Sequence, residues 1–501
     1  MPSQLSPAEI EKAAKALKAT GGKTISPLDY RFLVPELLGY VSHDALHRYS
    51  LTAMRAYVDT LKMYKEIPED AADIVIAAYT PEKVPCKKAD AIEENITKHD
   101  VRAKVRAAQS AIPRSMRGWA YLAPTSFDLL DTAKAAALRD AGMEVILPDA
   151  IKYERALIKR FAEIEENGPL VMMGRTHKQH AACTTFGHVV GEWLGGFHPA
   201  VEEFHRSIGM LRGKFSGFVG TRAAQKLLFE MNPKSISGNV MLHMGLTEDP
   251  LTGQVVHQTY FFPYFSNLVL MSANIAKFAE DIRNYSQTEV GEIVEGKLST
   301  AVGSSTGAHK ANPINSENIG GQWRSIDADI VSVYNDIITD FQRDLRSSAN
   351  SRFYVPEIPA KATYAIRRAT ALAEKFNVRR SKIAENIGLT RGQVIAEPLQ
   401  LYLQKWTAAQ GRFVDAHDYV RKLSNKALDS GKTLQEIASE DRLIAKMFKE
   451  IPKEKVEIIL DPVKYIGEAD RDARVFLKHL ERDLISIEAA IEEHKLKITY
   501  I

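Results

Sequence analysis

The chain has 501 residues, 45% hydrophobic and 26% charged, and its formal net charge is +3 at pH 7. This composition is that of an ordinary globular protein of about two to four domains, and it argues against nucleic acid or a membrane surface as the main partner. Two cysteines, no signal-peptide pattern and no run of about 18 apolar residues predict a cytoplasmic protein without a disulfide framework.

Helical periodicity dominates the chain. A capped helix is expected from Ser126, because hydroxyl side chains precede acidic residues in the first turns. Apolar residues recur at steps of three and four in segments 186–208 and 268–282, which predicts two long helices. Alternating patterns are scarce, and only 145–148 and 171–174 are candidates for short strands.

Shifts in composition divide this all-α pattern into three parts. Up to Pro113 the helices are short and punctuated by proline, and after the prolines of segment 356–359 another helical set begins. We therefore expect an N-terminal helical domain over 1–112, a central bundle of long helices over 113–358 and a C-terminal helical domain over 359–501.

Four polar segments interrupt the helical pattern, at residues 123–133, 174–187, 251–258 and 303–313. The last, "GSSTGAHKANP", lacks the spacing of a nucleotide-binding P-loop. Its backbone N–H groups and hydroxyls, with the charge of Lys310, could instead hold a carboxylate. On composition alone, a solvated surface loop is an equally good interpretation.

His177 and His180 stand three residues apart, but no third-ligand pattern accompanies them, so no metal site is predicted. A hydrogen-bonded structural histidine is the common case, whereas Thr176 and His177 beside Arg175 suit a general acid or base. Segment 382–397 has the form of a helix-turn-helix, but the basic footprint of DNA binding is absent.

Taken together, the polar segments resemble the fumarase/aspartase superfamily, and within it the adenylosuccinate lyases. Residues 303–313 resemble the signature G-S-S-x-M-P-x-K-x-N-P, residues 125–133 the segment T-S-x-D-x-x-D-T-A, and residues 174–187 the segment G-R-T-H-x-x-H-A-x-x-T-T-F-G. Four further matches complete the family's order: 26–32, 98–101, 251–256 and 341–352.

The resemblance implies a three-domain subunit whose central helices form a twenty-helix core in a homotetramer, with each active site shared among three subunits. It implies Ser304 as general base, with Lys310 assisting it, and His177 as general acid oriented by Glu317. No metal or organic cofactor is implied. The positions that match the family's substrate ligands are Arg31, His99, Asp100, Thr125, Ser126, Thr176, Gln254, Asn312, Arg343, Ser348 and Arg352.

The phosphate-binding positions point to one substrate class. In adenylosuccinate lyases, the residues matching Arg31, Arg343, Ser348 and Arg352 grip a nucleotide 5′-phosphate, and guanidinium groups suit phosphate oxygens. The resemblance thus implies elimination of fumarate from adenylosuccinate to give AMP, and from the related succinyl-carboxamide ribotide. Two alternatives stay open: another carbon–nitrogen lyase acting on an argininosuccinate-like or other amino-substituted succinate, and a non-catalytic helical binding protein.

Several positions depart from the family pattern. Tyr121 stands in place of a histidine and Ala123 in place of a glycine. Phe32 replaces a tyrosine, Gln258 an arginine, and the segment 307–308 reads Gly-Ala instead of Met-Pro. Because the predicted catalytic side chains are all retained, we expect a working lyase with an altered pocket.

Overall fold

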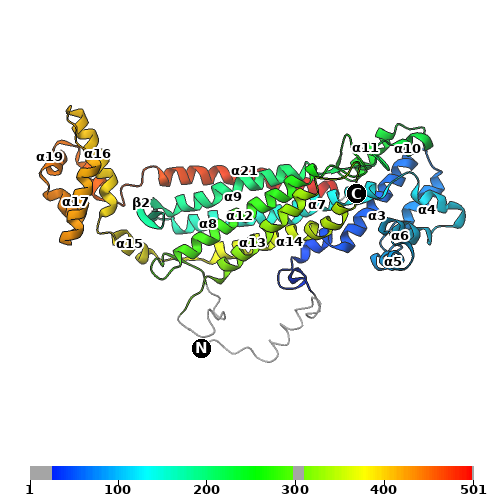
Figure 1. Ribbon diagram of the computed structural model, residues 1–501, viewed down its shortest axis with the longest axis horizontal. Coiled ribbons are helices and arrows are strands. Elements are labelled where there is room, and N and C mark those ends of the chain that lie inside the picture. The colour runs from blue at the N-terminus through cyan, green and yellow to red at the C-terminus, as the bar shows by residue number, and fades with distance from the viewer. Residues whose placement is uncertain (1–24, 297–309, 499–501) are drawn as a thin grey trace, which may run out of the picture.

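A computed structural model describes residues 25–296 and 310–498 (Figure 1). Long helices run side by side along the longest axis of the molecule, and a smaller group of helices lies at each end. The long elements are α7 (Ser126–Ala141), the π-helical turn η5 (Gly142–Ile146), α8 (Leu147–Ile164), α9 (Phe186–Ile208), α12 (Phe262–Tyr285), α13 (Ile314–Asn335), α14 (Arg346–Lys375) and α21 (Ala469–Ile498).

Buried aromatic side chains hold the long helices together. The Trp193 ring of α9 meets Phe278 of α12 edge-on at 5.0 Å, and Tyr153 of α8 meets Phe197 at 4.8 Å. Such edge-to-face pairs add to the stabilisation that burial of their apolar area provides. The apolar faces predicted from the spacing in α9 and α12 are therefore the faces that form the central core.

Short helices and the 21-residue α3 (His43–Met63) build the end of the molecule that contains the N-terminal part of the chain, so the expectation of short helices before Pro113 is wrong for α3. Residues 213–248 return to this end, where Phe215 stacks on Tyr57 at 5.0 Å within a second apolar cluster. The helices of this end are η1 (Pro27–Asp29), η2 (Pro35–Leu37), α2 (Leu38–Val41), α3 (His43–Met63), α4 (Glu69–Ala78), α5 (Cys86–Ile92), η3 (Glu93–Thr97), α6 (Asp100–Gln109), η4 (Arg114–Tyr121), α10 (Ala223–Leu228) and α11 (Pro233–His243).

The opposite end carries a third apolar cluster, formed by residues between 395 and 459. From there α21 returns along the bundle beside α9 (Figure 1). The helices of this end are α15 (Arg380–Gly388), η7 (Gln393–Ile395), α16 (Ala396–Ala409), α17 (Ala416–Ser430), α18 (Leu434–Glu440), α19 (Arg442–Glu450) and α20 (Lys453–Leu460).

Strands are short and occur in pairs. β1 (Val171–Thr176) and β2 (Gln179–Thr185) form an antiparallel hairpin at the end that carries α15 (Figure 1). The others are a parallel pair, β3 (Arg212–Gly213) with β4 (Thr247–Glu248), and an antiparallel pair, β5 (Ile293–Val294) with β6 (Asn377–Val378). A 3-10 turn, η6 (Gln258–Tyr260), precedes α12.

The structure confirms the predicted helical class, the helices at 186–208 and 268–282 and the strand at 171–174. The strand predicted at 145–148 is wrong, because this segment joins η5 to α8. Pro148 falls in the first turn of α8, where its missing N–H breaks no helical bond. The domain limits at 112 and 358 stay predictions, and the prolines at 356 and 359 lie inside α14. Among the residues described, no helix combines the length and apolarity needed to span a bilayer.

Candidate active site

The N-terminus of α7 is built by a capping box. The Thr125 backbone N–H donates to Asp128 Oδ2 at 2.7 Å, and the Thr125 side chain accepts from the backbone of the same first turn. Thr125 is thus the N-cap that the sequence predicts, with Ser126 as the first helical residue. A helix N-terminus with exposed N–H groups favours an anion, so this turn can hold a carboxylate.

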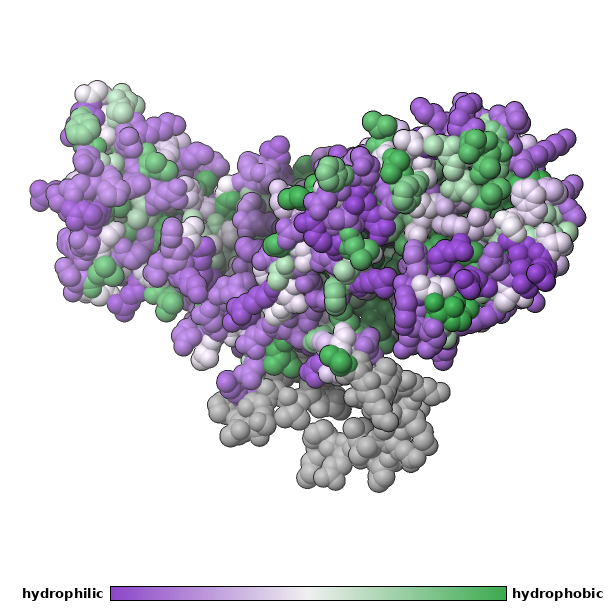
Figure 2. Space-filling model, turned by 45° about the vertical axis from the view of Figure 1, so that its right-hand side comes forward, coloured by the Kyte–Doolittle hydropathy of each residue, from purple (hydrophilic) through white to green (hydrophobic). Residues whose placement is uncertain are grey.

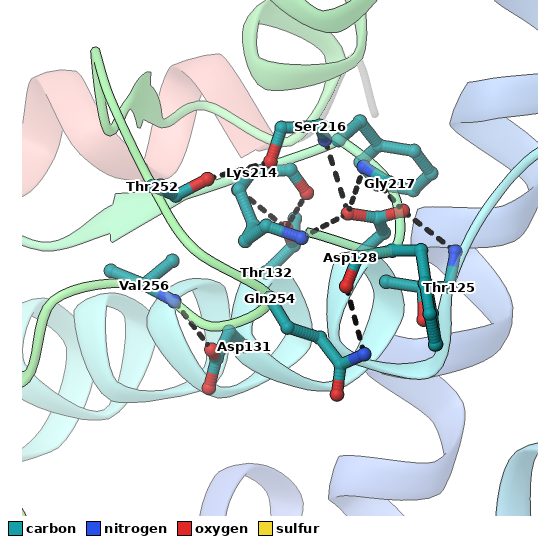
Figure 3. A network of polar contacts seen from close by, with 12 residues as sticks. Thr125, Asp128, Asp131, Thr132, Lys214, Ser216, Gly217, Thr252, Gln254 and Val256 are labelled. Carbon is teal, nitrogen blue, oxygen red and sulfur yellow. Dashed lines mark hydrogen bonds and ion pairs between the residues drawn. The ribbon is translucent and has the colours of Figure 1, made fainter. Parts of the chain in front are cut away.

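A buried ion pair supports this turn (Figure 3). Asp128 and Lys214 have no exposed side-chain surface and contact each other directly. The same carboxylate accepts the backbone N–H groups of Ser216 at 3.1 Å and Gly217 at 3.2 Å. Lys214 therefore neutralises an acid that would otherwise repel an anion at the α7 N-terminus, and it ties the 214–217 loop to the helix.

Gln254 and Arg343 meet beside this network. Gln254 Nε2 donates to the Phe218 carbonyl at 2.9 Å, and Gln254 Oε1 accepts from Arg343 Nη1 at 2.8 Å. The Arg343 guanidinium also lies 3.9 Å from the centre of the Phe127 ring. Burial lowers the pKa of Arg343, while the carboxylates of the neighbouring acids act in the opposite direction. This arginine is held in one orientation by an amide and an aromatic face.

The remaining predicted ligands of this end surround the same turn. His99 Nε2 lies 3.4 Å from Ser126 Oγ, and Arg352 Nη2 lies 3.8 Å from Asp100 Oδ2. Asp100, Ser348 and Arg352 line a cavity of about 570 Å³ together with Phe127 of α7. Arg31 is exposed directly after η1, whose residues line the same cavity. One end of the subunit thus gathers carboxylate-binding and phosphate-binding candidates from five separate segments.

The predicted acid lies on the β1–β2 hairpin instead. His177 and Lys178 form its two-residue turn with φ of 51° and 62°, the conformation of a type I′ hairpin turn that glycine or asparagine usually occupies. Thr176 and His177 are exposed. Two residues before His177, the Arg175 guanidinium donates to both carboxylate oxygens of the buried Glu292, at 2.9 and 2.6 Å. Asn386 donates to the same carboxylate at 2.7 Å.

The other catalytic candidates lie at the start of α13. Glu317 is exposed in its first turn, and Lys310 and Asn312 precede the helix. Glu295 accepts the backbone N–H groups of residues 315 and 316 at 3.1 and 2.7 Å, which satisfies donors that this helix end leaves open. Ser304 lies outside the described residues.

The two groups of candidates are far apart within one chain. A continuous helix, from Ser126 at the start of α7 to Ile164 at the end of α8, separates them, and at about 1.5 Å per residue its length is about 60 Å. Figure 1 places the hairpin and the N-terminus of α7 near opposite ends of the bundle. One subunit by itself does not bring His177 to the side chains around Ser126.

Comparison with known proteins identifies the family. The family described as "Lyase" matches residues 34–326. The chain belongs to this lyase family. It is 29% identical over 458 residues to adenylosuccinate lyase from Pyrococcus horikoshii, covering 91% of this chain and 98% of that protein. It is 30% identical over 408 residues to adenylosuccinate lyase from Aquifex aeolicus, covering 81% and 89%.

Solved structures share the fold. The fumarate lyase from Mesorhizobium sp. BNC1 has a TM-score of 0.76 at 22% identity, covering 89% of this chain and 98% of its own. The 3-carboxy-cis,cis-muconate lactonizing enzyme from Pseudomonas putida has a TM-score of 0.75 at 22% identity, covering 91% and 98%. The resemblance to the fumarase/aspartase superfamily is confirmed, and the protein is a lyase.

The structure shows which residues surround the positions where this lyase departs from the family pattern. Burial raises the pKa of Tyr121, whose ring centre lies 6.0 Å from the Arg102 guanidinium. Gln258 is buried, donates to the Val256 carbonyl at 3.0 Å and accepts from Lys134 Nζ at 3.4 Å. A positive charge therefore lies beside the position where the family pattern has an arginine.

Two other departures concern shape. Phe32 packs edge-on against Tyr364 at 5.0 Å, so its ring stabilises the junction of η1 with α14. Ala123 adopts φ of 79°, the left-handed region that a glycine enters at little cost. The 307–308 replacement lies outside the described residues.

Sequence reasoning missed the side chains that position the site. Asp131 accepts the Val256 N–H at 2.8 Å, Asp128 and Lys214 form the buried pair, and Glu292 anchors the hairpin. Only Asp128 carried a local signal, since an acid three residues after a threonine N-cap is the pattern of a capping box. The partners of the others lie about a hundred residues away along the chain, and no spacing rule connects them.

Proposed function

We propose that this lyase eliminates fumarate from adenylosuccinate to give AMP, and from the related succinyl-carboxamide ribotide. The observation that carries the proposal is the cavity beside the α7 N-terminus. Ser348 and Arg352, which suit a phosphate, line this cavity together with Phe127. The carboxylate-binding candidates Thr125 and Ser126 directly precede Phe127, and Arg343 contacts its ring. A substrate with a succinyl group at one end and a phosphate at the other matches this pairing.

The proposed elimination needs a base, an acid and a stabilised carboxylate. Ser304 takes the proton from the carbon beside a succinyl carboxylate, with Lys310 stabilising the charge that develops. The electron pair of that C–H bond forms the double bond of fumarate, and the C–N bond breaks with its electrons on nitrogen. His177 gives that nitrogen a proton, and Glu317 stabilises the histidine cation. Proton transfer and charge stabilisation suffice for these steps.

We further propose a homotetramer whose active sites combine residues of three subunits. His177, Glu317 and Lys310 are exposed at one end of the bundle, with the proposed ligands Thr176 and Asn312 beside them, while the other proposed ligands lie at the opposite end. Large apolar side chains are also exposed, among them Tyr334 and Ile338 of α13 and its following turn at 60% and 71%. Figure 2 shows apolar patches among the hydrophilic surface of one face. Exposed apolar area of this kind favours burial against another subunit.

The direct test is turnover of adenylosuccinate by the purified protein, followed by ultraviolet absorbance with separate detection of fumarate. AMP and fumarate should form in equal amounts. Argininosuccinate as a parallel substrate tests the alternative, because a lyase of that type would release fumarate from it and not from adenylosuccinate. Ser304→Ala should abolish turnover while substrate still binds; a variant that keeps its rate would refute the assignment of the base.

The phosphate assignment has a matched control on the same helix. Arg352→Ala should raise KM for adenylosuccinate by about ten- to a hundredfold, since hydrogen bonds to charged groups contribute about 1.5–3 kcal/mol each. Arg346, which is exposed and paired with Asp344 at 2.6 Å, should tolerate replacement by Ala with KM unchanged. Equal effects of the two replacements would contradict the nucleotide assignment.

A further inference from the structure

A cluster of side chains that can bind a metal ion lies at the rim of the 570 Å³ cavity, away from the proposed catalytic groups. His43 is the first residue of α3, and Cys86 and Asp90 are four residues apart on α5. One ligand atom from each, a ring nitrogen, a thiol sulfur and a carboxylate oxygen, lies within 4.8 Å of the other two. We propose that His43, Cys86 and Asp90 bind a divalent transition metal ion of the Zn²⁺ class.

The distances fit this ion with little movement. His43 Nε2 lies 2.9 Å from Asp90 Oδ1, and Cys86 Sγ lies 3.9 Å from the same oxygen. A tetrahedral site with Zn–N and Zn–O of about 2.0 Å and Zn–S of about 2.3 Å places its ligand atoms about 3.3–3.7 Å apart. Opening the His43–Asp90 contact and closing the Cys86–Asp90 contact, each by a few tenths of an ångström, therefore makes room for the ion.

The donor types select the ion. A thiolate and an imidazole favour Zn²⁺ and its soft relatives over Mg²⁺ and Ca²⁺, which prefer oxygen ligands alone. With a cysteine thiolate and the Asp90 carboxylate, a divalent ion gives a neutral centre. Burial and the nearby carboxylates of Asp90 and Asp44 raise the pKa of the Cys86 thiol to about 11, so an ion that binds there must displace the thiol proton.

The exposure of these side chains allows a metal ion to enter the site and leaves its fourth coordination position open. Cys86 is buried, whereas the His43 and Asp90 side chains are 70% and 46% exposed, and both line the cavity. Water can occupy the fourth position from that side. Because the ion would connect α3 to α5, it would stiffen the wall of the cavity that also contains Asp100 and Arg352. This proposal does not depend on the substrate proposed above.

The second cysteine of the chain supplies a matched control for the test. The full-length protein, treated with a chelator and dialysed, is titrated with Cd²⁺, and the thiolate-to-metal charge-transfer band is followed in the ultraviolet. We expect one equivalent per chain, loss of the band in Cys86→Ser, and an unchanged band in Cys183→Ser. Absence of a saturable band in the unsubstituted protein, or a band that persists in Cys86→Ser, overturns the proposal.

His43→Ala tests the same site without disturbing the core, because this side chain is exposed. It should weaken Cd²⁺ binding by at least about tenfold, the loss that even outer partners of metal ligands produce. Zn²⁺ should raise the Tm of the unsubstituted protein and of Cys183→Ser by mass action, and should leave the Tm of Cys86→Ser unchanged. If His43→Ala binds Cd²⁺ with unaltered affinity, the ion binds the Cys86 thiol without His43, and the three-ligand site is overturned.

Discussion

The two ends of the bundle each contain a buried cation–carboxylate pair, but they present their polar residues differently. At one end, Asp128 and Lys214 lie directly beneath the N-terminus of α7, and the side chains above them contact one another. At the other, the Arg175–Glu292 pair lies two residues before His177, which is exposed at the tip of a hairpin.

The two ends differ in that side chains orient one another at the first end, whereas a single side chain, His177, is exposed at the tip of a hairpin at the second. Amide, guanidinium and aromatic contacts orient Gln254 and Arg343 within one subunit, so this end is organised before a substrate arrives. His177 has an exposed side chain at a hairpin turn. Under the proposed mechanism, such a lyase would complete its site by bringing opposite ends of different subunits together.

The largest expected effect comes from separating the two ends by mutation. His177→Ala should lower kcat by about 10²–10⁴-fold, the usual contribution of a general acid, and Arg352→Ala should act on substrate binding. Unfolding and refolding the two variants together should give mixed oligomers whose activity exceeds that of either parent. In such oligomers some sites receive an intact His177 and an intact Arg352 from different chains.

The control for this experiment is a mixture of His177→Ala with the double variant His177→Ala/Arg352→Ala. No site in that mixture has an intact acid, so activity should stay at the level of His177→Ala. If mixed oligomers of the two single variants form and their activity does not rise, both residues belong to one subunit's site, and the comparison of the two ends is wrong.

The next effect in size concerns the anchor at the binding end. Lys214→Met leaves Asp128 buried without its counter-charge and should lower the free energy of unfolding by about 3–5 kcal/mol. Asp128→Asn combined with Lys214→Met should recover part of this loss, because no lone charge then remains. Urea unfolding measures the free energy of unfolding of the single and the double variant. As a control, Lys152→Met removes an exposed lysine 3.1 Å from Asp149 and should lower this free energy by less than about 1 kcal/mol.

At the hairpin end the same kind of substitution should affect rate more than binding. Glu292→Gln weakens the Arg175 fork, and hydrogen bonds to charged groups are worth about 1.5–3 kcal/mol. Because the fork holds the hairpin that carries His177, kcat should fall by a larger factor than KM rises; the proposed ligand Thr176 lies on the same hairpin. Steady-state kinetics separate the two; a rise in KM with unchanged kcat would mean that the hairpin belongs to the binding surface.

Local sequence patterns predicted the helical framework well. Apolar spacing defines α9 and α12, and hydroxyl and acidic residues mark the N-terminus of α7, because these signals depend on neighbours one turn away. The segment at 145–148 misled the prediction, since a short run of apolar residues suits a strand and a buried helix equally.

Long-range pairing could not be predicted in the same way. Lys214 meets Asp128 across 86 positions of sequence, and Arg175 meets Glu292 across 117. Nothing in the sequence around Lys214 or around Arg175 distinguishes these residues from cations on the surface. The resemblance to the superfamily supplied the candidate ligands around the α7 N-terminus, whereas the groups that position them became visible only in the fold.

The smallest expected effect tests backbone strain at the organised end. An L-residue in the left-handed region costs about 1–2 kcal/mol, and Ala123 has φ of 79°. Hydrogen bonds hold the preceding carbonyls, from Tyr79 Oη to Ala120 at 2.8 Å and from Tyr57 Oη to Leu122 at 3.0 Å, and the capping box holds Thr125. Both flanks are fixed, so the strain cannot relax.

Ala123→Gly should therefore raise the free energy of unfolding by up to about 1 kcal/mol, since glycine's larger entropy loss of about 0.5–1 kcal/mol offsets part of the relief. Ala120→Gly, in a fully buried position without positive φ, should lower it. Urea unfolding of both variants gives the comparison. Destabilisation by Ala123→Gly would show that the methyl group of Ala123 packs usefully, whereas stabilisation with unchanged KM would show that this strain is not required for substrate binding.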